Sequence, residues 1–187
     1  MTNVLPTTLA PRSALLRSVG YAAALAPLSL LATARSMVGR SAEAHRTWSR
    51  LARTLRSPEP VTIRRPGAWR SLGYGVLGVV LGLVCWFLLF MLVTAVLRGV
   101  FYGFVTDGPY GPGTWGGPTK AGAWAVHAAV SIPVLIVVPL LLRGIGLMHC
   151  GLIRRLYGAS VAWWVLPATI VSCSAGMLLL YSWTQQL

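Results

Sequence analysis

The chain has 187 residues, of which 56% are hydrophobic and only 10% charged, and its mean hydropathy is +0.69. A soluble domain carries roughly 25% charged residues, so this composition excludes a soluble globular fold, and it is too hydrophobic for a disordered chain. Sixteen Lys and Arg stand against three acidic residues, an excess that in a hydrophobic chain marks cytoplasmic loops rather than a nucleic-acid surface. We therefore predict an all-α, polytopic helical bundle in the cell membrane, with the lipid bilayer as partner and no nucleic acid.

The first apolar segment, residues 18–34, follows a start, residues 1–12, that we expect to be disordered. Its 17 uncharged residues are few for a span, which needs about 20. The segment has three interpretations: a short span, a re-entrant or interfacial helix, or a cleaved signal peptide, since Arg12 and Arg17 precede it and Ala32-Thr33-Ala34 ends it. Cleavage would leave nine Arg residues outside. We therefore favour a span, and the side of the membrane on which the N-terminus lies stays open.

A basic amphipathic helix is predicted over residues 41–56. Arg46, Arg50 and Arg53 fall on one face of this helix. The opposite face carries an apolar stripe: Ala44, Trp48, Leu51 and Leu55. Such a helix can lie on an inner leaflet, with its cations on anionic lipid headgroups and its Trp among them. The alternative is that the apolar stripe packs on a partner or on the protein's own loops.

Three further spans follow this helix. Residues 71–97 and 121–142 are free of charge over 27 and 22 residues, and residues 159–187 hold an additional C-terminal transmembrane helix. The span 71–97 contains Gly78 and Gly82, a G-x-x-x-G pattern that lets two helix backbones approach closely. This pattern can serve a homodimer or, as we favour, helix packing within one chain.

Basic residues are distributed unevenly along the chain. Residues 35–70 and 143–155 carry 12 of the 16 Lys and Arg, and two spans separate these stretches, so both lie on one face of the membrane. The positive-inside rule makes this face cytoplasmic. The loop 98–120 and both ends of the chain are then expected on the outer face.

The loop 98–120 is the one sizeable outer segment and is rich in Gly, Pro and aromatic residues. Asp107, Tyr110 and Trp115, with His127 one to two turns into the next span, are our candidates for a ligand-binding surface. Aromatic rings offer flat apolar area, Asp107 is the acid of this loop, and an ionisable residue inside a span is a functional candidate. The alternatives are that the aromatic residues anchor the loop at the membrane interface and that His127 is an ordinary packing residue.

No catalytic, cofactor-binding or metal-binding pattern is present in the sequence. A phosphate-binding loop, an H-E-x-x-H helix, a C-x-x-C pair and a G-x-S-x-G elbow are all missing. Cys85 and Cys173 lie in apolar stretches, and none of the three Cys residues lies in the outer loop, so no disulfide framework is implied. We therefore expect no enzyme activity, no cofactor and no metal.

Several short stretches combine small, aromatic and basic residues in a recurring way: Val38 to Ser41, Arg50 to Arg53, Trp69 to Tyr74, Gly78 to Gly82, Tyr110 to Thr119, Ala121 to His127 and Leu142 to Gly158. Together they resemble an actinobacterial sensor domain family, over residues 18–158. In that family the domain is often the membrane input module in front of a histidine kinase. The chain departs from the family in having one short span before the basic helix, and a further span where a kinase would follow.

The resemblance implies an integral membrane sensor or regulatory subunit in signal transduction, with residues 13–158 as the sensor-like domain. It supplies no catalytic residues, so the output would pass through a partner such as a histidine kinase or a regulator. One alternative is a ligand-free membrane scaffold. The other is a small transporter component, whose supply of polar residues would be Thr94, His127, Ser131, Thr169, Ser172 and Ser174.

Overall fold

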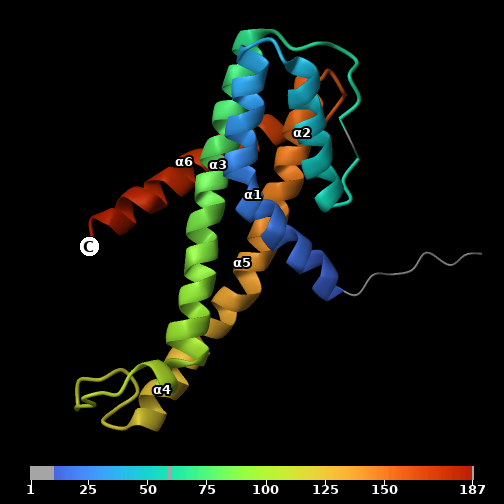
Figure 1. Cartoon of the computed structure of the whole chain (residues 1–187). Helices are drawn as coiled ribbons and strands as arrows, with labels where there is room; N and C mark the ends of the chain where they lie inside the picture. The colour runs from blue at the N-terminus through green and yellow to red at the C-terminus, as the bar shows by residue number, and fades with distance from the viewer. Residues whose placement is uncertain (1–10, 59, 187) are drawn as a thin grey trace, which may run out of the picture.

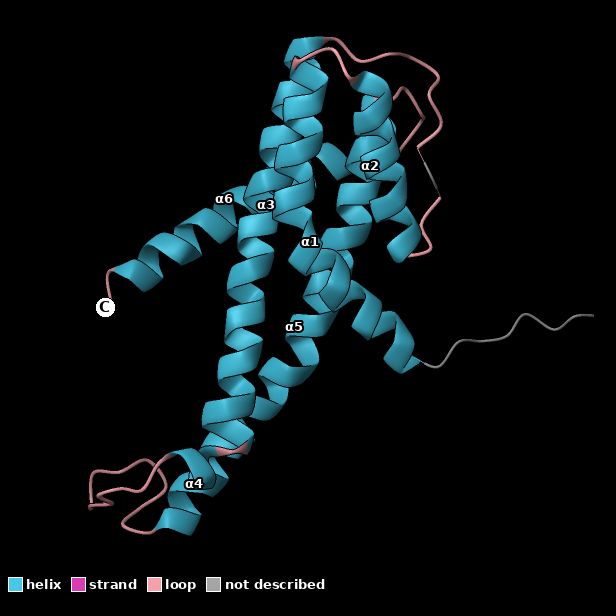
Figure 2. Cartoon of the chain, in the orientation of Figure 1, coloured by secondary structure: helices cyan, strands magenta, loops and turns pink. Residues whose placement is uncertain are grey.

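The computed structural model describes residues 11–58 and 60–186, with side chains from residue 14 onward, and these ranges contain helices and loops but no strand (Figure 2). The elements are α1 (Pro11–Met37), α2 (Ser41–Thr54), α3 (Ala68–Ala95), the π-helix η1 (Val96–Val100), the short α4 (Tyr102–Val105), α5 (Lys120–Leu156) and α6 (Val165–Thr184). The all-α prediction is confirmed.

Four helices are long and apolar enough to cross a membrane: residues 14–37, 68–100, 120–156 and 165–184. The prediction of about four spans is therefore confirmed. The first span is longer than the 17 uncharged residues predicted, because the helix continues through Arg17 and Arg35. Of the start that we expected to be disordered, residues 1–10 lie outside the described residues, whereas residues 11 and 12 already belong to α1.

Helix α5 also exceeds its prediction. We predicted a span over 121–142, but a single helix continues through Arg143 to Leu156. Arginine is a good helix former, so the charge that ends the apolar stretch does not end the helix. At 1.5 Å per residue, this helix rises about 55 Å, against roughly 30 Å for a bilayer's hydrocarbon core. Part of α5 must therefore extend beyond the hydrocarbon or tilt strongly.

Small residues bring α1 and α3 into close contact, antiparallel to each other (Figure 1). A Cβ atom on Gly82 would overlap the backbone of Ala26, and one on Gly78 would lie 2.8 Å from the Ser29 hydroxyl. Gly78 and Gly82 thus pack within one chain, the alternative favoured for the G-x-x-x-G pattern. Because α1 also contributes the fully buried Tyr21 to the core, a cleaved signal peptide would remove part of the core itself.

The bundle has two chemically different ends, seen at the top and bottom of Figure 1. We call residues 35–67 and 143–158 the basic end, where the backbone carbonyl of Tyr157 accepts hydrogen bonds from the amides of Ile63 (3.1 Å) and Arg64 (3.0 Å). We call residues 96–119 the loop end. Helix α6 crosses α3 at an angle between the two ends (Figure 1), and Trp183 near its end contacts the rings of Phe87 and Phe90 on α3.

Candidate functional site

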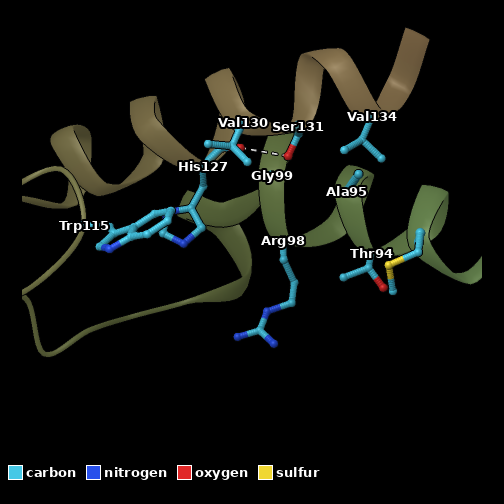
Figure 3. A pocket seen from close by; sticks show the side chains of 10 residues that line it. Thr94, Ala95, Arg98, Gly99, Trp115, His127, Val130, Ser131 and Val134 are labelled. Atoms are coloured by element: carbon cyan, nitrogen blue, oxygen red, sulfur yellow. Dashed lines mark hydrogen bonds between the residues drawn. The ribbon is translucent and has the colours of Figure 1, made fainter. Parts of the chain in front are cut away.

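A pocket of about 250 Å³ lies at the loop end, between α3 with η1 on one side and α5 on the other (Figure 3). Trp115 and His127 lie next to each other at one end of the pocket, and Thr94 and Val134 lie at the other (Figure 3). The lining is largely apolar and consists of Met91, Thr94, Ala95, Arg98, Gly99, Trp115, His127, Val130, Ser131 and Val134. A mostly apolar pocket with a few polar groups is the usual form of a small-molecule site.

The π-helix η1 shapes this pocket. Five-residue π turns interrupt the regular hydrogen bonding of an α-helix and are frequent at functional sites. Here the turn contains Arg98 and the buried Gly99, and a Cβ atom on Gly99 would overlap the side chain of Ser131. The absence of a side chain at Gly99 therefore lets α3 and α5 approach closely at the pocket. The indole N–H of Trp124 on α5 donates to the Val100 carbonyl at 2.8 Å and holds η1 in place.

The two basic residues that flank the loop, Arg98 and Lys120, differ in whether they form a salt bridge. Lys120 forms a salt bridge with Asp107 at 3.4 Å, and this Asp107 side chain is 94% exposed. Arg98 is exposed at the pocket and has no salt bridge to any described residue. The pocket therefore combines an apolar interior with one guanidinium that has no counter-ion.

His127 is fixed by two contacts. Its Nδ1–H donates to the Ala123 carbonyl at 2.8 Å, and its ring stacks on that of Tyr102, with 3.9 Å between centroids and 14° between planes. The His127 carbonyl in turn accepts a hydrogen bond from Ser131 at 2.8 Å, the dashed line in Figure 3. A ring held in this way is well suited to forming a rigid wall of the pocket.

The four predicted ligand-binding residues separate into two pairs. Trp115 and His127 line the pocket. Asp107 does not, and its carboxylate is turned to Lys120. Tyr110 does not line the pocket either, since its hydroxyl donates to the Thr106 carbonyl at 2.7 Å and closes a turn of the loop.

Sequence reasoning missed the remaining lining residues. Arg98 could have been found most easily, because it is a basic residue directly after the uncharged stretch 71–97. Thr94 and Ser131 were noted as polar residues in spans, but nothing in the sequence shows that α3 and α5 bring them to one pocket. Gly99 gains its role from the register of these two helices, which a single sequence does not reveal.

At the basic end, α2 keeps the predicted amphipathic pattern, but its apolar stripe is buried in the protein. Trp48 is 4% exposed and lies against the His149 ring, with 5.3 Å between centroids. The alternative of packing on the protein itself therefore applies, and Trp48 is not a headgroup anchor. Arg46, Arg50 and Arg53 are exposed on the opposite face. Their placement on anionic lipid headgroups stays a prediction.

Beneath α2 lies a buried polar contact between α1 and α5. The Tyr21 hydroxyl and Nδ1 of His149 are hydrogen-bonded at 2.7 Å, and both side chains are 1% exposed. The Ser29 hydroxyl and Nε2 of His149 are buried without a hydrogen-bond partner, and both lie near Gly78. Nearby, burial raises the pKa of Tyr157 to about 12. The hydrogen bond between Tyr21 and His149 joins α1 to α5.

A second hollow, of about 520 Å³, opens at the surface of the basic end. Its lining includes the polar or charged side chains of Arg46, Arg65, His45 and Tyr157. His45 is held by the Pro60 carbonyl at 2.6 Å and by edge contact with the Tyr157 ring. Within the described residues, no group of three His, Cys, Asp or Glu side chains is placed to hold a metal ion.

The length and apolar surface of the four helices define a multi-pass membrane protein. No family model, curated protein or solved structure matches the chain. Any assignment of function therefore rests on the residues of this chain alone.

Proposed function

We propose that the protein is a membrane sensor or regulatory subunit whose input site is the loop-end pocket. The observation that carries this proposal is the position of the pocket on α5, because one continuous helix runs from the pocket wall to the basic end. A ligand that favours one arrangement of α5 over another would shift the population of the whole molecule. The resemblance of residues 18–158 to sensor domains agrees with this proposal.

The input region has features of a two-state element. The π turn of η1 is a local departure from the α-helical pattern. Pro133, beside the pocket, and Pro139, beyond it, each remove one intrahelical hydrogen bond from α5. Trp115, which is 69% exposed, lines the pocket from a Gly-rich loop rather than from a helix. A ligand in the pocket therefore contacts the part of the bundle where η1 and α5 can change arrangement together.

The output would leave from the basic end. Helix α2 packs mainly on α1, and its Trp48 lies against the His149 ring of α5, so a shift of α5 changes a contact under α2. The exposed Arg46, Arg50 and Arg53 present a cationic face to anionic lipid headgroups or to an acidic surface of a kinase or regulator. In this proposal the chain has no catalytic output of its own.

A transporter component is the alternative, and the packing between the two ends argues against it. Leu81, Cys85, Val138 and Leu142 are buried between α3 and α5 and belong to the hydrophobic core. Thr169, one of the polar residues that could line a path, donates to its own helix at the Val165 carbonyl instead. The polar residues Thr94, His127 and Ser131 gather in the pocket and do not continue across the bundle.

The test compares two changes in the loop, Trp115→Ala and Asp107→Ala, in a strain lacking the native gene. Trp115 lines the pocket, whereas Asp107 lies in the same loop outside it, so the second variant is the matched control. The readout is the set of transcripts that changes on deletion, measured at equal membrane abundance of each variant. We expect the wild type and Asp107→Ala to restore this set and Trp115→Ala to leave it shifted. Full restoration by Trp115→Ala, or no transcript change on deletion, would contradict the sensor proposal.

A further inference from the structure

We propose that the loop-end pocket binds a single-chain amphiphile with one anionic headgroup, such as a fatty-acid carboxylate. This inference rests on the proposed function, which makes the pocket the input site, and it names the class of ligand. It follows from three properties of the pocket: its apolar depth, its uncompensated cation and its size.

The deeper part of the pocket selects an apolar group. Met91, Ala95, Val130 and Val134 supply alkyl surface from both helices. From Arg98 back to Met91 the wall follows two turns of helix, which is about 10 Å along the axis. An alkyl chain lying in this part loses contact with water along its length, and each buried methylene is favourable.

The outer part of the pocket selects an anion. Arg98 is exposed at its wall, and the carboxylate of the loop, Asp107, is paired with Lys120. Glu43, the other described acid, pairs with Arg35 and Arg40 at the opposite end of the molecule. A guanidinium without a counter-ion beside an apolar cavity binds a carboxylate or phosphate with charge-assisted hydrogen bonds. The ligand would therefore place its headgroup at Arg98 and its chain along the apolar lining toward Val134.

The volume limits the ligand to one chain. Pockets for drug-sized molecules measure about 300 to 1,000 Å³, and this pocket, at about 250 Å³, lies just below that range. It is too small for the two acyl chains and the glycerol unit of a bilayer phospholipid. A bilayer phospholipid therefore does not fit inside the pocket as a whole, and one that reached it would insert only part of itself.

The experiment measures binding of tritiated dodecanoate to the full chain in nanodiscs of zwitterionic lipid, with empty nanodiscs as background. We expect saturable binding of one molecule per chain, displaced by unlabelled dodecanoate and not by dodecanol or dodecyltrimethylammonium. Across octanoate, decanoate and dodecanoate, each added methylene that is buried should tighten binding about 4-fold. If dodecanol displaces the bound dodecanoate as effectively as unlabelled dodecanoate does, the proposal that the ligand needs an anionic headgroup is wrong.

Two variants test the residues. Arg98→Gln removes the proposed headgroup contact, and we expect roughly 10- to 150-fold weaker binding, the range for a hydrogen bond to a charged group. Arg70→Gln removes an exposed cation at the other end of α3 and leaves the pair of Asp107 and Lys120 intact, so it should bind as the wild type does. Val130→Trp fills the apolar part and should abolish saturable binding while Arg98 remains. Equal binding by the wild type and Arg98→Gln would overturn the proposal.

The two proposals fail in different ways. If dodecanoate binds as described but Trp115→Ala restores the transcripts fully, the ligand class stands and the sensor function fails. If Trp115→Ala fails to restore the transcripts but no saturable binding above empty nanodiscs is found, the sensor function stands and the ligand class fails. The binding assay uses no signalling readout, so the outcomes are independent.

Discussion

Replacing Gly82 by Ala tests the packing on which the bundle depends. A Cβ atom at this position would lie 2.6 Å from the Cβ of Ala26 and would overlap the α1 backbone, which cannot move aside as a side-chain tip can. Gly73 is the control, because a Cβ there meets nothing within 4 Å on the same helix. Both changes gain the same helix propensity, about 0.5–1 kcal/mol. Overpacking costs about 1–3 kcal/mol, so G82A should unfold more easily than G73A by this amount.

Unfolding in mixed micelles with rising SDS, followed by far-UV circular dichroism, measures this difference. A gap of about 1–3 kcal/mol corresponds to a roughly 5- to 150-fold change in the unfolding constant. G73A should be as stable as the wild type or slightly more stable. If G82A and G73A have the same midpoint and slope, the contact between α1 and α3 described here is wrong.

Three further predictions concern topology, the buried polar contact and pH. In intact cells, a Cys introduced at Thr62 should be protected from a membrane-impermeant reagent and one at Thr114 labelled, since the basic end is predicted to be cytoplasmic; reversed labelling would overturn the orientation. Tyr21→Phe leaves Nδ1 of His149 without its partner and should lower the free energy of unfolding by about 1–3 kcal/mol, whereas unchanged stability would contradict the hydrogen bond. The difference in phenolate absorbance between the wild type and Tyr157→Phe reports the ionisation of Tyr157. This difference should titrate near pH 12 rather than 10. Because the unfolded chain ionises this phenol first, Tyr157 should destabilise the fold as pH rises from 10 to 12, and a titration near 10 would contradict its burial.

The spans could be predicted from sequence because each carries its own signal, an uncharged apolar stretch of sufficient length. The helix ends could not, since the membrane boundary and the helix boundary are set by different physics. Arg143 marks where the apolar stretch stops, but it is a good helix former, and the helix continues to Leu156. The same holds for α1, which begins before Arg17.

The candidate site was predictable only in part, for a different reason. Trp115 and His127 could be singled out by residue type and position in the chain. That Arg98 would join them, and that Asp107 would turn to Lys120 instead, depends on how the loop folds over the ends of two helices. The role of Trp48 shows the same limit, because an apolar stripe does not reveal whether lipid or protein covers it.

The length of α5 gives it the properties of a lever. From Ser131 at the pocket to Leu156, the helix rises about 38 Å, and the two prolines that weaken it lie close to the pocket rather than midway. A tilt change of about 10°, within the spread of tilts among transmembrane helices, would move the far end by about 6 Å. That displacement exceeds one helical turn, so a change too small to open or close the pocket visibly would still reposition the surface that α2 presents.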